Sequence, residues 1–264
     1  MNLELNNKVA IIAASTEGLG FATAKELAKE GAKVVICGRT QELLNKAIKK
    51  LNEITDPNKI LGVCIDLTAS SQIEQLVKET VNQFGGIDIL ITNAGGPPTG
   101  IFSTSKLEEF EKAFQLTLMS AVRLIHFALP YLRQSKAPSI LTITSVSAKQ
   151  PIPGLLQSNI FRPAVIGFTK HLSQELGREN IRVNSILPGF TATDRTNALL
   201  AKWAEQRGSS IEQEKQKRAE AVPLGRMGKP EEFAKVAAFL VSPAASYLSG
   251  VMLQVDGGAY TGLL

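Results

Sequence analysis

Residue types that build metal sites and disulfides are scarce in this sequence. Its 264 residues include two cysteines and two histidines, so we expect no histidine–cysteine metal site. Cys37 and Cys64 each lie in an apolar, strand-like run. This position predicts two buried thiols rather than a disulfide, as in a protein of the reducing cytoplasm. His126 and His171 fall in helical patterns, and we expect them to be structural or surface residues.

Long apolar runs and a strong charge bias are also missing. No apolar run approaches the roughly 20 residues of a membrane span, and the N-terminal segment MNLELNNK lacks the apolar core of a signal peptide. The net charge of +5 is mild, and no run of five or more Lys/Arg residues interleaves with aromatic residues. We therefore expect a globular protein that binds neither membranes nor nucleic acid.

Seven apolar runs alternate with helical patterns along the whole chain. The runs are continuous rather than alternating in polarity, which is typical of a parallel sheet covered on both faces. The predicted strands are Val9–Ala13, Val34–Cys37, Leu61–Ile65, Ile87–Thr92, Ile140–Thr144, Arg182–Leu187 and Met252–Val255. No linker, repeat or low-complexity run interrupts them. The prediction is a single doubly wound α/β domain over residues 1–264.

Capping patterns predict where several helices begin. Thr40 is expected to cap one helix, and Pro230 to occupy the first turn of another. The pairs Ser71 with Glu74 and Ser105 with Glu108 read as capping boxes.

The turn Ala13–Gly20, with the sequence AASTEGLG, gives the first functional signal. It stands between a predicted strand and a predicted helix, as in the first half of a dinucleotide-binding unit. Small residues let the backbone approach a pyrophosphate, and the helix N-terminus offers free N–H groups. An ordinary strand-to-helix turn explains two glycines equally well, so the rest of the chain must decide.

Six motifs in sequence order resemble those of the short-chain dehydrogenase/reductase family, especially its 3-oxoacyl-[acyl-carrier-protein] reductase-like branch. They are the glycine-rich turn, Asp66, Thr92-Asn93-Ala94-Gly95, Ser145, Ile181-Arg182-Val183-Asn184 with Pro188-Gly189, and Val255-Asp256-Gly257-Gly258. The resemblance covers about residues 5–260. It implies a Rossmann fold, a nucleotide cofactor, and oxidoreductase chemistry between a carbonyl and a secondary alcohol. It also implies a homo-oligomer, a tetramer or dimer, with the helices after the fourth and fifth strands at the interface.

The resemblance also assigns the cofactor contacts. They are Ala14, Ser15, Thr16, Gly18, Leu19 and Gly20 in the turn, Asp66 and Leu67 at the adenine, Asn93, Ala94 and Gly95 on the cofactor floor, and Pro188, Gly189, Thr191 and Thr193 along the nicotinamide. A strand-end cap is the alternative role for Asp66. Ala14 replaces a glycine of the family pattern, which is tolerable only if its φ is negative.

Arg39 determines the predicted choice of cofactor. Relatives that prefer NAD place an acidic residue at the end of the second strand, where it binds the ribose 2′-OH. This chain has Gly38-Arg39 there, and Arg39 offers a charge-assisted contact to a 2′-phosphate. We therefore predict NADP(H) rather than NAD(H). Glu17 adds negative charge to the turn, which argues against NADP(H). The alternative role for Arg39 is that of a surface arginine that binds no cofactor.

The predicted catalytic positions depart from the family pattern of Asn, Ser, Tyr and Lys. Ser145 matches the serine, but Ser158, Arg162 and Thr117 stand where the tyrosine, lysine and asparagine are expected. A serine hydroxyl is far less acidic than a tyrosine, and arginine stays protonated. Arg162 can still polarise a carbonyl or hold an anion.

Pro163 and the segment 194–226 carry two further predictions. Proline is tolerated in the first turn of a helix, so Pro163 predicts a helix that begins near Arg162. Ser158 would then precede the helix, and the i, i+4 stacking of the two positions would be lost. By resemblance, residues 194–226 form a substrate flap, in which Trp203 is either a packing anchor or a substrate-facing residue.

Two functions remain open at this point. The first is an NADP(H)-dependent oxidoreductase that acts on a small-molecule carbonyl or alcohol, with Ser145 holding the oxygen and Arg162, Ser158 or a water replacing the usual acid. The second is a cofactor-binding protein that has lost reductase chemistry and acts in sensing or assembly. No other tyrosine near the motif offers an evident substitute, although Tyr260 could approach a neighbouring subunit's site.

Overall fold

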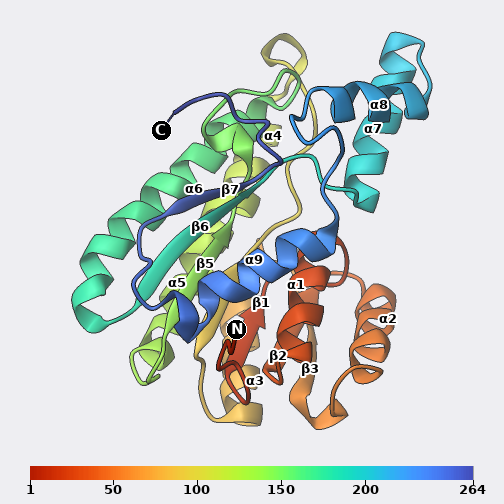
Figure 1. The fold of residues 1–264 in the computed structure, drawn as a ribbon. Helices are drawn as coiled ribbons and strands as arrows, with labels where there is room; N and C mark the ends of the chain where they lie inside the picture. Colours follow the sequence, from red (N-terminus) through yellow and green to blue (C-terminus); the bar gives the residue numbers. More distant parts are fainter. Residues whose placement is uncertain (264) are drawn as a thin grey trace.

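The computed structural model describes residues 1–263, which form a seven-stranded parallel sheet with helices on both faces (Figure 1). The strand order is β3-β2-β1-β4-β5-β6-β7. The strands are β1 Val9–Ile12, β2 Lys33–Gly38, β3 Ile60–Cys64, β4 Ile89–Thr92, β5 Ser139–Ile143, β6 Arg182–Pro188 and β7 Met252–Val255. The predicted fold is confirmed, and each predicted strand is present with ends that shift by two residues at most.

Within residues 1–263, nine α-helices connect or cover these strands. They are α1 Gly18–Lys29, α2 Gln41–Asn52, α3 Ser70–Phe84, α4 Leu107–Phe114, α5 Ser120–Leu132, α6 Leu156–Glu175, α7 Asp194–Arg207, α8 Ile211–Glu220 and α9 Pro230–Val241. Short 3-10 turns are η1 Pro57–Lys59, η2 Phe102–Thr104, η4 Val146–Ala148, η5 Leu176–Glu179 and η6 Pro243–Ala245, and η3 Gln115–Met119 is a π-helix. Helices α7 and α8 form a pair beyond the end of the sheet, at the top right of Figure 1.

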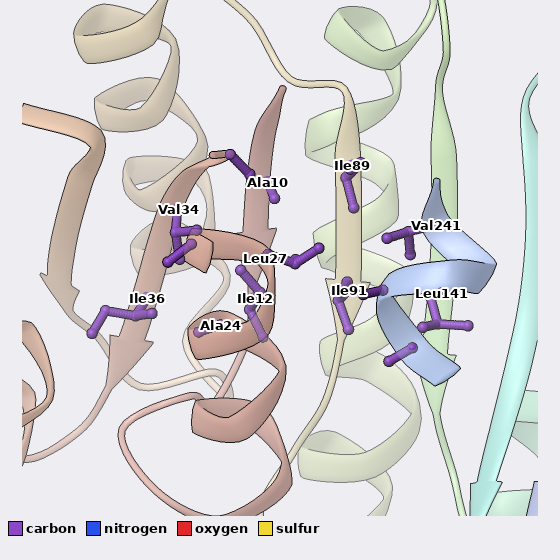
Figure 2. Packing of buried hydrophobic residues seen from close by; sticks show 14 of the residues in the cluster. Ala10, Ile12, Ala24, Leu27, Val34, Ile36, Ile89, Ile91, Leu141 and Val241 are labelled. Atoms are coloured by element: carbon purple, nitrogen blue, oxygen red, sulfur yellow. The ribbon is translucent and has the colours of Figure 1, made fainter. Parts of the chain in front are cut away.

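Two apolar cores separate the sheet from its helical layers. Along β1, Ala10 and Ile12 face one core and Ile11 faces the other, because successive strand residues point to opposite faces. Helices α1, α2 and α9 cover the first face, and α3, α5 and α6 cover the second. Figure 2 shows the first core, where Ala24 and Leu27 of α1 pack beside strand residues of β1, β2 and β4. Burial on both faces explains why the strands read as continuous apolar runs.

Some local predictions are wrong. Cys64 is exposed, whereas Cys37 is buried as predicted. The exposure has a simple reason, since Cys64 is the last residue of β3, the strand at the edge of the sheet. The Ser71 and Ser105 capping boxes do not form: α3 begins earlier, at Ser70, and the carboxylate of Glu109 accepts from the backbone N–H of Lys106 at the start of α4.

The helix starts at Thr40 and Pro230 are confirmed, but the start of α6 is not where we predicted it. Thr40 precedes α2 without a side-chain cap bond, and Pro230 is the first residue of α9. Helix α6 runs unbroken from Leu156, so Pro163 lies inside it and Ser158 and Arg162 share one helix. An interior proline costs about 3 kcal/mol. Burial of the sheet-facing side of α6, including Val165 and Leu172, offsets this cost.

The segment Leu107–Leu132, which joins α4, η3 and α5, is a continuous helical stretch of 26 residues. An 18-residue window within it has a mean hydropathy of 1.2, so the stretch is long and apolar enough to cross a membrane, which the sequence pattern did not predict. In the fold, Leu124, Ala128 and Leu132 are buried in the second core. Core helices of water-soluble domains meet the same criteria, so length and hydropathy alone assign no membrane role.

Arg182 and Asn184, from one of the sequence motifs, tie β6 to the end of α9 and to the segment before β7. The guanidinium of Arg182 donates to Leu240 O at 2.7 Å, Val241 O at 3.0 Å and Ser242 O at 3.0 Å. Asn184 donates to Leu248 O at 2.9 Å and accepts from Val251 N at 3.0 Å. Arg182 thus satisfies carbonyls that the C-terminus of α9 leaves without helical partners.

Replacing Arg182 with alanine is expected to lower the free energy of unfolding by about 2–3 kcal/mol, because three carbonyls lose a charged donor. Urea denaturation followed by circular dichroism measures this change. Arg178→Ala is the matched control, since Arg178 is exposed on η5, and its effect should stay within about 0.5 kcal/mol. Equal stability of the two variants would show that the Arg182 contacts contribute nothing.

Candidate active site

A cleft of about 720 Å³ opens at the carboxyl ends of the strands, where ligands bind in doubly wound folds. Loops after β1 to β6 line it, together with the first turns of α7. Most of the predicted site residues line this cleft: Ala14, Thr16, Gly18, Leu19, Arg39, Asp66, Leu67, Asn93, Ala94, Gly95, Ser145, Ser158, Arg162, Pro188, Gly189, Thr191 and Thr193. Three others, Ser15, Gly20 and Thr117, are not among its lining residues.

Ser15 and Gly20 shape the turn from behind the cleft. The Ser15 hydroxyl is fully buried, donating to Ile12 O at 2.6 Å and accepting from Cys37 N at 3.2 Å. Gly20 lies against the carbonyl oxygen of Ala14. Both residues therefore hold the turn in place, while Thr16, Gly18 and Leu19 face the space where a dinucleotide would bind.

Ala14 adopts the backbone conformation that we predicted it must avoid. Its φ is +46°, in the left-handed region, and Gly18 in the same turn has a φ of +59°. Long-range contacts impose this conformation: the Asn93 side chain donates to Ala14 O at 3.0 Å, and Ser15 N donates to Cys37 O at 3.0 Å. The turn therefore keeps its shape without the family's glycine, at a cost of about 1 kcal/mol.

Ala14→Gly is expected to raise the free energy of unfolding by about 0.5–1 kcal/mol, because glycine adopts positive φ without a Cβ clash. This gain remains after the greater freedom of glycine in the unfolded chain is subtracted. Thermal or urea unfolding measures it. At the control position, Ala221, φ is −77° and the residue is exposed, so Ala221→Gly should destabilise. A lower free energy of unfolding in Ala14→Gly would contradict the claim that the backbone of Ala14 is strained.

Arg39 and Asp66, which follow β2 and β3, line the cleft. Arg39 is exposed after β2, beside Gly38 and Thr40, and the three residues line the cleft together. Oδ1 of Asp66 accepts from the backbone N–H and from the hydroxyl of Thr68, both at 2.8 Å. Asp66 thus caps the turn after β3, the alternative role considered for it, and it also lines the cleft.

The cleft also contains Ser145, Ser158 and Arg162. Ser145 follows β5, and its Oγ accepts from Ser147 N at 3.1 Å, which leaves its O–H free to donate. Ser158 and Arg162 stand one turn apart on α6, so they share a face of that helix. The stacking that Pro163 was predicted to abolish is therefore retained.

Arg162 is buried, with 8% of its surface exposed. Its Nη1 donates to Ile143 O at 2.9 Å, while Nε has no hydrogen-bond partner in the described part of the chain. Burial and the nearby charge of Arg195 lower the pKa of Arg162 to about 10. The guanidinium therefore stays charged at neutral pH, where it can stabilise negative charge but cannot release a proton.

Thr117 lies in the π-helix η3, between α4 and α5. It is buried, and its hydroxyl has no hydrogen-bond partner within residues 1–263. Its neighbour Leu116 lines the cleft instead. Because π-bulges concentrate at functional sites, the position fits a supporting role, but the structure does not bring the Thr117 side chain into the cleft.

The segment 194–226 contains α7 and α8, and Trp203 holds them together. Trp203 is 4% exposed and packs against Phe190, with ring centroids 6.1 Å apart. The guanidinium carbon of Arg218 also lies over Trp203, 4.4 Å from the ring centroid. An ion pair between Arg207 and Glu214 at 2.6 Å also joins the two helices. Of the two roles considered for Trp203, the structure supports the packing anchor.

Sequence reasoning missed Arg195 and Lys202, which reach the cleft from α7. Arg195 donates to Gly96 O at 2.9 Å and to Pro97 O at 3.2 Å. The position of Arg195 in the sequence could have indicated this role, because a cation in the first turn of a helix interacts unfavourably with the helix dipole. Such a residue is better explained by a contact outside the helix.

His126 and His171 are exposed on α5 and α6, as predicted for surface residues. Across residues 1–263, no three His, Cys, Asp or Glu side chains gather in a group that could hold a metal ion.

Comparison with known proteins places this geometry in a family. The enoyl-(acyl carrier protein) reductase family model matches residues 13–260. A 3α-hydroxysteroid dehydrogenase of Mediterraneibacter gnavus is 34% identical over 98% of this chain and 99% of its own length. The 3-oxoacyl-[acyl-carrier-protein] reductase FabG of Vibrio cholerae is 35% identical, with the same coverage of 98% and 99%.

Solved structures show the same similarity. L-sorbose reductase from Gluconobacter frateurii, complexed with NADPH and L-sorbose, superposes with a TM-score of 0.93 at 31% identity and 100% coverage of both chains. Actinorhodin polyketide ketoreductase with NADPH has a TM-score of 0.91 at 29% identity, over 96% of this chain and 97% of its own. The chain therefore belongs to the short-chain dehydrogenase/reductase family, in its 3-oxoacyl-[acyl-carrier-protein] reductase-like branch.

Proposed function

We propose that this protein is an NADP(H)-dependent oxidoreductase that interconverts a carbonyl and a secondary alcohol. One observation carries the proposal: a single cleft contains the glycine-rich turn and Arg39 at one end and Ser145 and Arg162 at the other. A dinucleotide bound along this cleft would have its phosphates near the start of α1 and its nicotinamide near β5. The NADPH complexes of the sorbose and polyketide reductases support this choice of cofactor.

The residues of the cleft fit a 2′-phosphorylated dinucleotide. Arg39 is exposed at the end of β2, between Gly38 and Thr40 rather than beside an acidic residue in the sequence. Asp66 and Leu67 follow the neighbouring strand β3 and would contact the adenine. Glu17 in the turn is exposed to solvent. When bound, the cofactor supplies or accepts the hydride, and the protein supplies position and electrostatics.

Ser145 and Arg162 would act on the substrate oxygen. The free O–H of Ser145 would donate to the carbonyl oxygen, and the charged guanidinium of Arg162 would stabilise the negative charge that develops there. Arg162 keeps its proton at neutral pH, so the proton that completes the alcohol would come from Ser158 or from water. Ser145, as a hydroxyl donor, and Arg162, as a fixed positive charge, would thus take the place of the family's tyrosine acid.

The test is oxidation of NADPH by the purified protein, followed at 340 nm, across a panel of ketones, sugars, steroids and acyl thioesters. Turnover with at least one carbonyl, faster with NADPH than with NADH, is expected. NADPH binding by fluorescence titration is measured on the same preparation. Binding together with turnover supports the proposal, and absence of both refutes it.

A cofactor-binding protein without reductase chemistry is the second candidate. It is favoured by one observation: Tyr131, Tyr247 and Tyr260 all lie outside the residues that line the cleft. In the experiment above, NADPH binding without turnover of any carbonyl would favour this second candidate over the first.

We also propose that the protein forms a homo-oligomer through the helices that follow β4 and β5. Leu107 and Phe114 of α4 and Ile160 of α6 are exposed apolar residues, and Phe114 lies against Phe161 of α6 with ring centroids 6.0 Å apart. An exposed apolar surface of this kind is typical of an interface. Size-exclusion chromatography with light scattering tests it, with a dimer or tetramer expected and a monomer contradicting the proposal.

A further inference from the structure

Two arginines from distant parts of the chain meet at the β5 end of the cleft. Arg162 comes from α6 and Arg195 from the first turn of α7, and both line the cleft. Backbone carbonyls hold each guanidinium in place: Ile143 O holds Arg162, and Gly96 O with Pro97 O holds Arg195. These carbonyls fix the two groups without neutralising them.

Neither guanidinium has a carboxylate partner. Within residues 1–263, none of the ion pairs includes Arg162 or Arg195. Lys202 and the exposed Asp194, also from α7, line the same cleft. Buried cations are ordinarily paired, since burial without a partner is costly. Arg162, nine-tenths buried and with an unpartnered Nε among the described residues, therefore offers a charged donor to an anionic group.

The phosphates of the cofactor do not account for this charge. Their expected positions are the start of α1 and Arg39, which follow β1 and β2. Arg162 bonds to β5, two strands away from β1 in the sheet order, which corresponds to about 10 Å. Arg195 lies closer than Arg162 to the glycine-rich turn, because Thr193 is next to Gly18. The effect of replacing Arg195 on NADPH binding must therefore be measured separately.

The Arg162 guanidinium lies close to Ser145, the proposed ligand of the carbonyl oxygen. Arg162 is held by Ile143 O, and Ser145 stands two residues further along the chain. Two extended residues span about 7 Å. A carbonyl held by Ser145 and an anionic group held by Arg162 can therefore belong to one short substrate.

We propose that Arg162 and Arg195 form a subsite for a carboxylate of the substrate, and that the substrate is a short oxo acid with its carboxylate one or two carbons from the reacting carbonyl. The inference rests on the proposed function, which identifies the reacting group as a carbonyl. Binding of a carboxylate at the subsite can nevertheless be measured without turnover. Guanidinium groups bind carboxylates through charge-assisted hydrogen bonds. Two of them around one carboxylate leave one net positive charge, which would stabilise the oxyanion that develops beside the carboxylate as the hydride adds.

Binding of amide analogues tests the subsite separately from catalysis, since an amide carbonyl is not reduced. Oxamate and malonamate carry the carboxylate at the two spacings, and oxamide and malonamide are their uncharged controls. Each is titrated into the protein–NADPH complex by calorimetry. We expect one of the two acids to bind, with its uncharged control binding at least about tenfold more weakly.

Variants then assign the binding to the arginines. Arg195→Met and Arg162→Met should each weaken binding of the acid about tenfold or more, with Lys replacements retaining part of it. Arg178→Met removes an exposed charge on η5 and is the control. Because Arg162 is buried, its replacement also perturbs the packing of α6, so the result for Arg195→Met decides.

Three results would overturn the proposal. The first is equal binding of the acids and their uncharged controls. The second is a loss of NADPH affinity in Arg195→Met with unchanged binding of the acid, which would assign the arginine to the cofactor. The third is arginine-dependent binding of inorganic phosphate without binding of either acid. Failure of NADPH turnover with intact acid binding would refute the proposed function and leave the subsite standing.

Discussion

Replacing Ser145 with alanine is expected to lower kcat/KM for carbonyl reduction by about 100- to 1,000-fold, the usual effect of removing a hydrogen-bond donor from a developing oxyanion. Ser145 is the residue after β5 whose O–H is free, because its Oγ accepts from Ser147 N. Alanine removes the donor to the substrate oxygen and leaves the glycine-rich turn and Arg39 untouched. NADPH affinity should therefore be unchanged, and steady-state kinetics with fluorescence titration separates the two effects.

Ser147→Ala is the matched control for this variant. Ser147 lies two residues away, and its hydroxyl is buried and unpartnered among the described residues. Ser145→Ala also removes the cap of η4, which costs about 1 kcal/mol of stability, so both variants are compared for unfolding as well. Equal kcat/KM for Ser145→Ala and the unmodified protein would exclude Ser145 from the reaction.

Replacing Arg39 with aspartate is expected to reverse the cofactor preference. Loss of a charged hydrogen bond to the 2′-phosphate costs about 1.5–3 kcal/mol, which raises the Kd of NADPH about 10- to 100-fold. The new carboxylate repels the phosphate further and can accept from the ribose 2′-OH of NADH. Titration of both cofactors against the variant measures the reversal.

Lys49→Asp makes the same change of charge on the exposed side of α2, outside the cleft. Its cofactor preference should match that of the unmodified protein. If Arg39→Asp binds NADPH as tightly as the unmodified protein does, Arg39 is a surface arginine that does not contact the cofactor. The predicted preference for NADP(H) would then have no physical basis in Arg39.

The fold was predictable because its signal is local and repeated. Strands β1, β2, β4, β5 and β6 are buried, so their apolar runs show in the sequence without knowledge of their neighbours. The edge strand β7, Met252–Val255, is less buried but has the predicted bounds. Most of the cleft residues follow strands, and parallel strands bring their carboxyl ends to one edge, whereas Ser158 and Arg162 come from α6.

The wrong predictions depend on contacts between distant segments. The φ of Ala14 is set by Asn93, which is 79 residues away, and no local propensity reveals it. Pro163 is accommodated because packing of α6 against the sheet outweighs the local cost of the proline. Arg195 reaches Gly96 across 99 residues, so its place in the cleft becomes visible once α7 is positioned.

Transfer of deuterium from 4-deuterated NADPH tests the central claim most directly. The protein is incubated with each stereoisomer of the labelled cofactor and a pooled panel of ketones and oxo acids, and the products are examined by mass spectrometry. The account predicts one deuterium on the carbinol carbon of an alcohol product, from one stereoisomer of the cofactor, and its loss in Ser145→Ala. Tight binding of NADPH with no deuterated product from either stereoisomer would contradict it.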